Sequence, residues 1–170
     1  MHETIEIQSP VGLLHLRPER EEDQAFRFQL FCDSRQPEFA LLLAPPAYQQ
    51  VMNHQFHAQT VGYRTEFPQA RFDIIELSGE PIGRIVVNRP GTMVHIVDHV
   101  IATQWRGRGI GTALMRTLMD EAGAAGLPVQ LEVVSENDPA YRLYQRLGFV
   151  AVETVPFYMR LEWRAPATSS

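Results

Sequence analysis

The segment Gln104-Trp105-Arg106-Gly107-Arg108-Gly109-Ile110-Gly111-Thr112 places three glycines at alternate positions, next to two arginines. The residues before it, 93–102, are rich in β-branched side chains and predict a strand. The residues after it, 114–122, carry apolar side chains at helical spacing, and Gly126 with Pro128 closes that helix. The sequence therefore predicts a strand, a glycine loop and a helix in this order.

The glycine loop is suited to hold a phosphate. Because glycine has no Cβ, successive backbone N–H groups can turn toward a ligand, and the N-terminus of the following helix adds partial positive charge. Arg106 and Arg108 add two positive charges, and no acidic residue lies between Gln104 and Thr112. A tight strand-to-helix turn would explain an isolated glycine pair, but three glycines beside two arginines favour a pyrophosphate site.

Two common nucleotide-binding motifs do not fit this loop. A dinucleotide fold places its glycines after the first strand and an acidic residue about 20 residues further on, whereas this loop lies beyond residue 100. A P-loop needs the pattern Gly-x-x-x-x-Gly-Lys-Ser/Thr, and the segment contains no lysine. Neither type of nucleotide site is predicted.

The rest of the sequence alternates between strand and helix patterns. The predicted order β-α-α-β-β-β-α-β-α-β-β is typical of an α/β domain with a mixed sheet. Before the loop we expect a strand over 13–17, helices over 19–33 and 45–63, the second ended by Gly62, and a hairpin of strands over 71–77 and 83–88. Beyond the helix that follows the loop we expect a strand over 129–134, a helix over 139–147 and a strand pair over 149–155 and 157–163.

Length and composition describe an ordinary globular protein. A chain of 170 residues fits a single domain, which we expect over residues 1–164 with a frayed tail at 165–170. Twenty acidic against 15 basic residues give a net charge of −5, which disfavours nucleic acid and membranes as partners. The single cysteine, Cys32, cannot form an intramolecular disulfide, and the chain shows no Cys/His spacing of the kind found in zinc sites. The N-terminal residues show no apolar signal segment. We therefore expect a cytoplasmic protein.

Two motifs in the chain resemble those of the GNAT superfamily of N-acetyltransferases. The family signature Gln/Arg-x-x-Gly-x-Gly/Ala matches Gln104, Gly107 and Gly109. A second signature, Asn-x-x-Ala-x-x-Leu-Tyr followed by Gly-Phe, resembles the series Asn137, Ala140, Leu143, Tyr144 and Gly148-Phe149. The similarity covers roughly residues 80–160, and the helical region 19–66 carries no motif of the family.

The resemblance implies an acyl-CoA N-acyltransferase fold, an α/β fold with a mixed, centrally splayed β-sheet flanked by helices. It also implies acetyl-CoA as the acetyl donor, bound in the gap between the central strands. The residues it assigns to the cofactor are Val100, Ile101 and Ala102 near the pantetheine, the backbone of Arg106, Gly107, Arg108, Gly109, Ile110, Gly111 and Thr112 on the pyrophosphate, and Asn137 and Tyr144 beside the arm. Chemistry agrees, because a thioester needs only its phosphates held and its carbonyl aimed for an amine to attack, without a metal.

The resemblance assigns the role of general acid to Tyr144, since a phenol with a pKa of about 10 keeps its proton at neutral pH. For the base, Glu132 lies five residues before Asn137, a spacing that resembles the ribosomal-protein alanine acetyltransferase branch. We expect partial burial to raise its pKa, and pairing with an arginine is the structural alternative. Asp98 and His99 are competing bases, of which at most one should reach the site unless a bulge intervenes. Alternatively, the amine could lose its proton to bulk water, in which case no side chain would act as the base.

The sequence leaves the acceptor open. We expect a primary amine of a small molecule or peptide, and the resemblance directs its specificity to residues 28–66. An acyl-CoA sensor without turnover is the alternative, although Tyr144 favours the enzyme. A structural protein without a cofactor would be expected to lose the loop glycines, which are present. The closing strands over 149–163 could form a homodimer contact if their edge is exposed.

Overall fold

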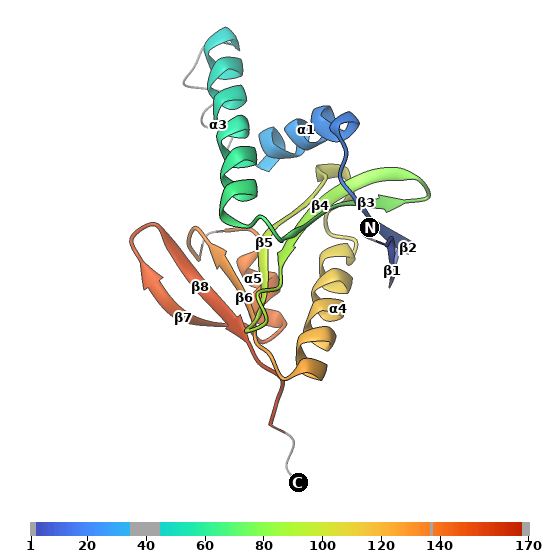
Figure 1. Ribbon diagram of the computed structural model, residues 1–170, viewed down its shortest axis with the longest axis vertical. Coiled ribbons are helices and arrows are strands. Elements are labelled where there is room, and N and C mark those ends of the chain that lie inside the picture. Colours follow the sequence, from blue (N-terminus) through green and yellow to red (C-terminus); the bar gives the residue numbers. More distant parts are fainter. Residues whose placement is uncertain (1–2, 35–44, 137, 168–170) are drawn as a thin grey trace.

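The computed structural model describes residues 3–34, 45–136 and 138–167. The described strands form one eight-stranded sheet in the order β1-β2-β3-β4-β5-β6-β8-β7. Helices α1 and α3 lie toward one side of this sheet and α4 and α5 toward the other (Figure 1). The predicted mixed α/β architecture is therefore confirmed.

The first five strands form an antiparallel meander. They are β1 (Ile5–Ser9), β2 (Gly12–Pro18), β3 (Arg71–Leu77), β4 (Glu80–Asn88) and β5 (Val94–Ile101). The turn of the predicted hairpin is Ser78-Gly79, where φ is 52° and 78°. Two successive left-handed residues suit a two-residue hairpin turn, and glycine meets this geometry without strain. Strand β1 was not predicted; Ile7 is its buried residue, packing under α4.

The centre of the sheet opens between β5 and β6 (Val129–Val133). These strands pair in parallel, but only over Val94–Ile96 and Val129–Leu131. Among the described residues, the later part of β5 has no strand partner on this side. Strand β8 (Tyr158–Trp163) pairs with β6, and β7 (Val150–Val155) forms the exposed edge. The central splay expected from the family resemblance is therefore present.

The two sheet faces carry separate clusters of apolar side chains. On one face, Ile85 and Val87 of β4 pack with α4 (Ile110–Ala125) and α5 (Tyr141–Arg146) in the main core. On the other face, the intervening Val86 packs with Tyr63 and Phe67 at the end of α3 (Pro45–Glu66). This alternation along β4 is the period of two that places successive side chains on opposite faces. Helix α1 (Gln24–Ser34) packs against α3 through Phe31, Met52 and Phe56.

Two helix boundaries differ from prediction. The segment expected to begin a helix at residue 19 forms a 3-10 turn, Glu21–Asp23, before α1 begins at Gln24. Gly62 was predicted to end the second helix, but α3 continues to Glu66. Packing of Tyr63 against the sheet outweighs the cost of about 1 kcal/mol for a glycine inside a helix. By contrast, α4 ends at Gly126 as predicted, with a left-handed φ of 70°.

In the part of the chain that the structure describes, no helix is both long enough and apolar enough to cross a membrane. Residues 165–167 of the predicted tail belong to no helix or strand.

Candidate active site

A pocket of about 760 Å³ opens where β5 and β6 separate. This volume lies within the range of small-molecule and cofactor sites. Its walls come from the end of β5, the glycine loop, the beginning of α4, α5 with the segment before it, and one residue each of α1 and α3. The lining residues are Ser34, Gln59, Asp98, His99, Val100, Ile101, Trp105, Arg106, Gly107, Gly109, Ile110, Gly111, Thr112, Asp138, Pro139, Ala140, Leu143 and Arg146.

The glycine loop forms one end of the pocket, which we call the loop end (residues 105–112). Gly107 and Gly109 have φ values of 73° and 84°, which only glycine adopts without strain. Gly109 is the N-cap of α4, and no described side chain caps this helix. The first hydrogen bond of the helix runs from the Ala113 N–H to the Gly109 carbonyl, 3.1 Å. The N–H groups of residues 110–112 precede this bond, so they are available to an anion at the helix N-terminus.

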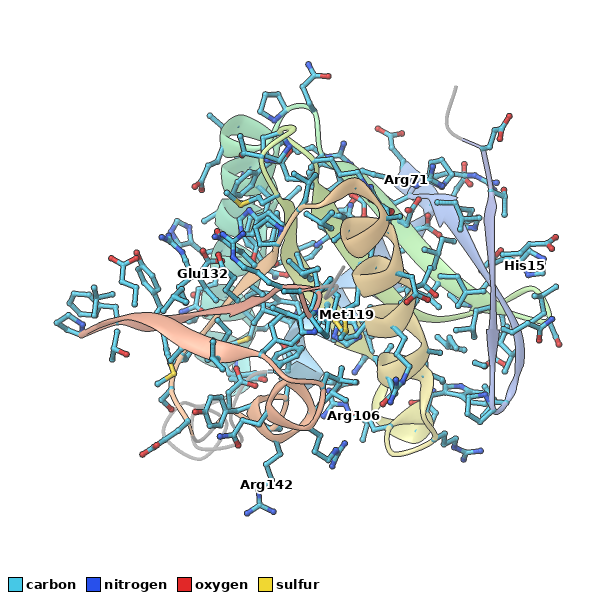
Figure 2. The ribbon with its side chains drawn as sticks, turned by 90° about the horizontal axis from the view of Figure 1, so that it is seen from below. His15, Arg71, Arg106, Met119, Glu132 and Arg142 are labelled. Atoms are coloured by element: carbon cyan, nitrogen blue, oxygen red, sulfur yellow. The ribbon has the colours of Figure 1, made fainter. Side chains whose placement is uncertain are left out.

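Arg106 adds positive charge to the loop end. Its Nε donates to the Ile101 carbonyl oxygen at 3.0 Å, which ties its guanidinium to the end of β5. Figure 2 shows Arg106 between the beginning of α4 and α5, whereas Arg142 points away from α5 into solvent. Arg108 instead stacks over the Trp105 ring, 4.9 Å from its centroid, and does not line the pocket. A third arginine, Arg146 of α5, does line it.

Most of the predicted cofactor residues lie at this pocket. Ala102 does not line it, because its side chain is buried and its N–H donates to the Ile82 carbonyl at 2.8 Å. Asn137 lies outside the described residues. The eight predicted residues that line the pocket are Val100, Ile101, Arg106, Gly107, Gly109, Ile110, Gly111 and Thr112.

Tyr144 lies in α5 directly beside the pocket wall. Its side chain is buried among core residues, its ring centroid is 5.6 Å from that of Phe149, and it is not among the lining residues. Burial raises the pKa of the phenol, and the negative charges of Asp138 and Asp98 raise it further. Both carboxylates line the pocket, so the hydroxyl lies within their electrostatic reach and remains protonated at neutral pH.

Glu132 does not line the pocket. Its carboxylate forms a 2.9 Å hydrogen bond with His95 and accepts a 3.3 Å bond from Nε of Arg160, on the exposed face of β5, β6 and β8 (Figure 2). The hydrogen bond with His95 and the charge of Arg160 outweigh partial burial and lower the pKa of Glu132. The expectation of a raised pKa was therefore wrong, and the pairing with an arginine that we considered as the structural alternative is observed.

Asp98 and His99 both line the pocket. The pairing of β4 with β5 shifts between Val86 and Val87, which leaves Val97 as an extra residue in β5. This is the bulge that the sequence analysis required for both neighbours to reach one site. The His99 ring packs against Gly111, where an added Cβ would lie 3.3 Å from its Cε1. Burial lowers the pKa of His99 to about 4, so its ring is uncharged at neutral pH.

A second part of the pocket lining, which we call the helix end, is formed by Ser34 of α1, Gln59 of α3 and Asp98. Ser34 and Gln59 were not predicted as site residues, because each is a polar residue on a helix without a motif. Asp98 is held by Arg84, whose Nη1 lies 3.3 Å from its Oδ2. A signal for Arg84 was present in the sequence, since a charged residue inside a β-branched run needs a buried partner.

The loop end fits the phosphates and arm of a CoA molecule. Two left-handed glycines, an uncapped helix N-terminus and Arg106 supply donors and positive charge for a pyrophosphate. The open edge of β5 at residues 100 and 101 supplies backbone groups along the pocket wall. The residues present therefore fit the cofactor implied by the sequence motifs.

Comparisons with known proteins agree with this geometry. The model of the acetyltransferase (GNAT) family matches residues 28–149. The chain is 33% identical over 104 residues to an N-alpha-acetyltransferase of Sulfurisphaera tokodaii, and 32% identical over 98 residues to an uncharacterised N-acetyltransferase of Methanocaldococcus jannaschii. Each match covers 53% of this chain, and the chain spans 62% and 43% of the length of these relatives.

Solved structures share the fold. The PaiA N-acetyltransferase of Thermoplasma acidophilum, in complex with coenzyme A, has a TM-score of 0.66 and 14% identity, covering 89% of this chain and 99% of its own. The RimJ protein of Mycobacterium smegmatis, in complex with CoA-disulfide, has a TM-score of 0.64 and 19% identity, covering 95% of this chain and 87% of its own. The family match, which extends over most of the chain, confirms the resemblance read from the two motifs. The chain therefore belongs to the acetyltransferase (GNAT) family, whose members use acetyl-CoA as the acetyl donor.

Proposed function

We propose that this protein is an N-acetyltransferase that transfers an acetyl group directly from acetyl-CoA to a primary amine of a small molecule or peptide. The observation that carries the proposal is one pocket with two chemically different ends. The loop end presents backbone N–H groups and Arg106, and the helix end presents the carboxylate of Asp98. The two parts of the lining would thereby attract an anionic donor and a cationic acceptor to different places in one pocket.

The loop end would hold the donor. The N–H groups of residues 110–112 and the side chain of Arg106 would bind the pyrophosphate, and the edge of β5 at residues 100 and 101 would align the pantetheine arm. When bound, acetyl-CoA supplies an acetyl carbonyl carbon for attack by the amine nitrogen, and CoA departs as a thiol. The chain contributes mainly position and charge, which suffice for a reaction between two oriented groups.

The helix end would receive the amine through Asp98. A carboxylate accepts hydrogen bonds from an ammonium or amine and attracts its positive charge. Neither alternative base has comparable access: Glu132 does not line the pocket, and the Nε2 of His99 is buried. We therefore favour Asp98 over Glu132 and His99 as the group that orients the acceptor and accepts its hydrogen bond.

Tyr144 would return a proton to the departing sulfur. Because its pKa is raised, the phenol remains protonated throughout the neutral and mildly alkaline range. The same burial makes it a weak acid, so its contribution depends on the negative charge that develops on the thiolate. The side chain of Tyr144 would have to rotate slightly toward the pocket, because Leu143 forms the pocket wall at this point.

The first experiment is thermal unfolding with CoA, acetyl-CoA, NAD and ATP. At 100 times its dissociation constant a ligand adds about 2.7 kcal/mol, which for this size corresponds to a rise of roughly 5–10 °C. We expect a rise with CoA and acetyl-CoA alone. No rise with either would contradict the donor site.

The second experiment measures thiol release from acetyl-CoA with spermidine, tyramine and a short peptide bearing a free N-terminus. We expect turnover with at least one amine, reduced about 100-fold by Tyr144→Phe at unchanged CoA affinity. Tyr141→Phe is the matched control, because Tyr141 is a second tyrosine of the same helix and is not one of the residues that match the family motif. Binding of acetyl-CoA without turnover of any amine would favour a sensor, and full activity of Tyr144→Phe would remove the tyrosine as acid.

A further inference from the structure

A network of buried charges lies behind the helix end of the pocket. Arg84 extends from β4 and is only 5% exposed. Its Nε donates to Oε2 of Glu19 at 2.9 Å, its Nη2 to Oε1 of Glu19 at 3.2 Å, and its Nη1 to Oδ2 of Asp98 at 3.3 Å. One guanidinium therefore holds two carboxylates, of which only Asp98 lines the pocket.

Glu19 connects this network to the helices of the helix end. Its side chain is 4% exposed, and Oε1 accepts a 2.6 Å hydrogen bond from Arg64 of α3. Nη1 of Arg27, on α1, lies 3.8 Å from the same oxygen. The Glu19 backbone N–H donates to the Phe72 carbonyl of β3 at 3.0 Å. Glu19 is thus fixed to the sheet and to α1 and α3, the two helices of the helix end.

The Asp98 carboxylate is oriented through both of its oxygens. While Oδ2 faces Arg84, Oδ1 accepts the His99 backbone N–H at 3.0 Å. On the other side, Tyr144 of α5 lies within electrostatic reach of the carboxylate. Among the described residues, the charged and titratable groups around Asp98 include Arg84 from β4, His99 from β5 and Tyr144 from α5, with Glu19 behind Arg84.

A network of this kind is a poor device for stability alone. Burying several ions costs solvation energy that their attraction only partly returns, so apolar side chains of similar size often serve equally well. Among the described residues, Nε and Nη1 of Arg27 are buried without a hydrogen-bond partner, which adds to the cost. The arrangement does accomplish one thing that apolar residues would not: it keeps a negative carboxylate at the pocket wall in one orientation.

We propose that Arg84 is a positioning residue that presents the charged carboxylate of Asp98 to the acceptor amine, and that Glu19 holds Arg84 in place. The inference rests on the proposed function, because it concerns the residue that would receive the amine. Without Arg84, Asp98 would lose its 3.3 Å cationic neighbour and would rotate or bind a proton more readily. The same change leaves the loop end untouched, since Arg84 does not line the pocket.

The test compares Arg84→Lys and Arg84→Met with the wild-type protein. Arg17→Lys and Arg17→Met are the matched controls, because Arg17 is a partly buried arginine between two carboxylates, Asp23 at 2.7 Å and Glu76 at 2.9 Å, but does not line the pocket. Circular dichroism and thermal unfolding establish that each variant is folded. If Arg84→Met does not fold, Arg84→Met combined with Glu19→Gln removes both charges and leaves no unpaired Glu19.

The first readout needs no acceptor. The 13C resonance of the Asp98 carboxyl carbon, assigned with Asp98→Asn, is titrated in aspartate-labelled protein. We expect the midpoint to rise by about one pH unit or more in Arg84→Met, to rise less in Arg84→Lys, and to stay unchanged in the Arg17 variants. An unchanged midpoint in folded Arg84→Met would overturn the proposal.

The second readout is turnover with the most reactive amine of the panel described above. We expect Arg84→Met to lower kcat/KM for the amine at least about 10-fold with the KM for acetyl-CoA unchanged, and Arg84→Lys to recover part of the loss. Equal losses in the Arg84 and Arg17 variants would indicate a purely structural role and would overturn the proposal. If the wild-type protein acetylates no amine, the proposed function fails, and the titration of Asp98 still decides whether Arg84 controls this carboxylate.

Discussion

The two ends of the pocket are built in different ways. The loop end consists mainly of backbone: Gly107 and Gly109 in left-handed conformations and the uncapped start of α4, all within residues 105–112. The helix end consists of side chains from distant parts of the chain, since Ser34, Gln59 and Asp98 come from α1, α3 and β5. A backbone site depends on where glycine is allowed, whereas a side-chain site can change with each substitution. The loop end is therefore suited to a constant donor and the helix end to a particular acceptor.

The largest effect should come from a glycine of the loop end. In Gly109→Ala the alanine would have to adopt the left-handed φ of 84°, which is unfavourable for a residue with a Cβ. This Cβ would also lie 2.8 Å from Cγ of Pro10. The loop must shift, and the N-terminus of α4 shifts with it. We expect the affinity for CoA to fall about 100-fold, measured by calorimetry.

Gly126→Ala is the control for this prediction. Gly126 ends the same helix, with a similar φ of 70°, and nothing lies within 4 Å of its added Cβ. We expect a loss of about 1–2 kcal/mol in stability with unchanged CoA affinity. Equal affinities of the two variants for CoA would show that left-handed glycines matter only for folding and would break the contrast between the two ends.

An intermediate effect should come from the charge at the loop end. Arg106→Gln removes a guanidinium that lines the pocket, and we expect about 10-fold weaker CoA binding with a smaller dependence on salt. Arg142→Gln changes an exposed arginine of α5 that points away from the pocket (Figure 2), and should leave binding unchanged. A similar loss in both variants would mean that net charge, rather than position, attracts the donor.

The smallest effect should come from Glu132, which belongs to neither end. The pKa of Glu132 is lowered by His95 and Arg160, so its ionised carboxylate is more stable in the folded protein than in the unfolded chain. The stabilisation is present above the unfolded pKa of about 4.5 and disappears as the pH falls through the lower folded value. Glu132→Gln should therefore cost at most about 1 kcal/mol at pH 7, and less in acid, by thermal unfolding.

Turnover of the same variant decides between two roles for Glu132. We expect Glu132→Gln to retain full activity with any amine that the wild-type protein acetylates. A loss of kcat at unchanged stability would restore Glu132 as the base that its spacing before Asn137 suggested. The reaction would then involve a third region besides the two ends of the pocket, on the face of β5, β6 and β8 where Glu132 contacts His95 and Arg160.

The amino-acid pattern alone predicts the strand, glycine loop and helix around Gly109, the end of α4 at Gly126 and the α/β order of elements, apart from β1. These features are local, because a left-handed turn or a helix end depends on a few neighbouring residues. Gly62 marks the limit of this reasoning, since packing of Tyr63 on the sheet carries α3 past it.

The side chains that share the pocket are brought together by the three-dimensional fold and do not follow from the local sequence. The spacing that suggested Glu132 is a distance along the chain, and it does not reveal that His95 and Arg160 lie across the neighbouring strands. In the same way, Arg84 meets Glu19 across 65 positions of sequence and Asp98 across 14. Contacts of this kind follow from strand register and from a bulge at Val97, which are properties of the whole sheet rather than of any single segment.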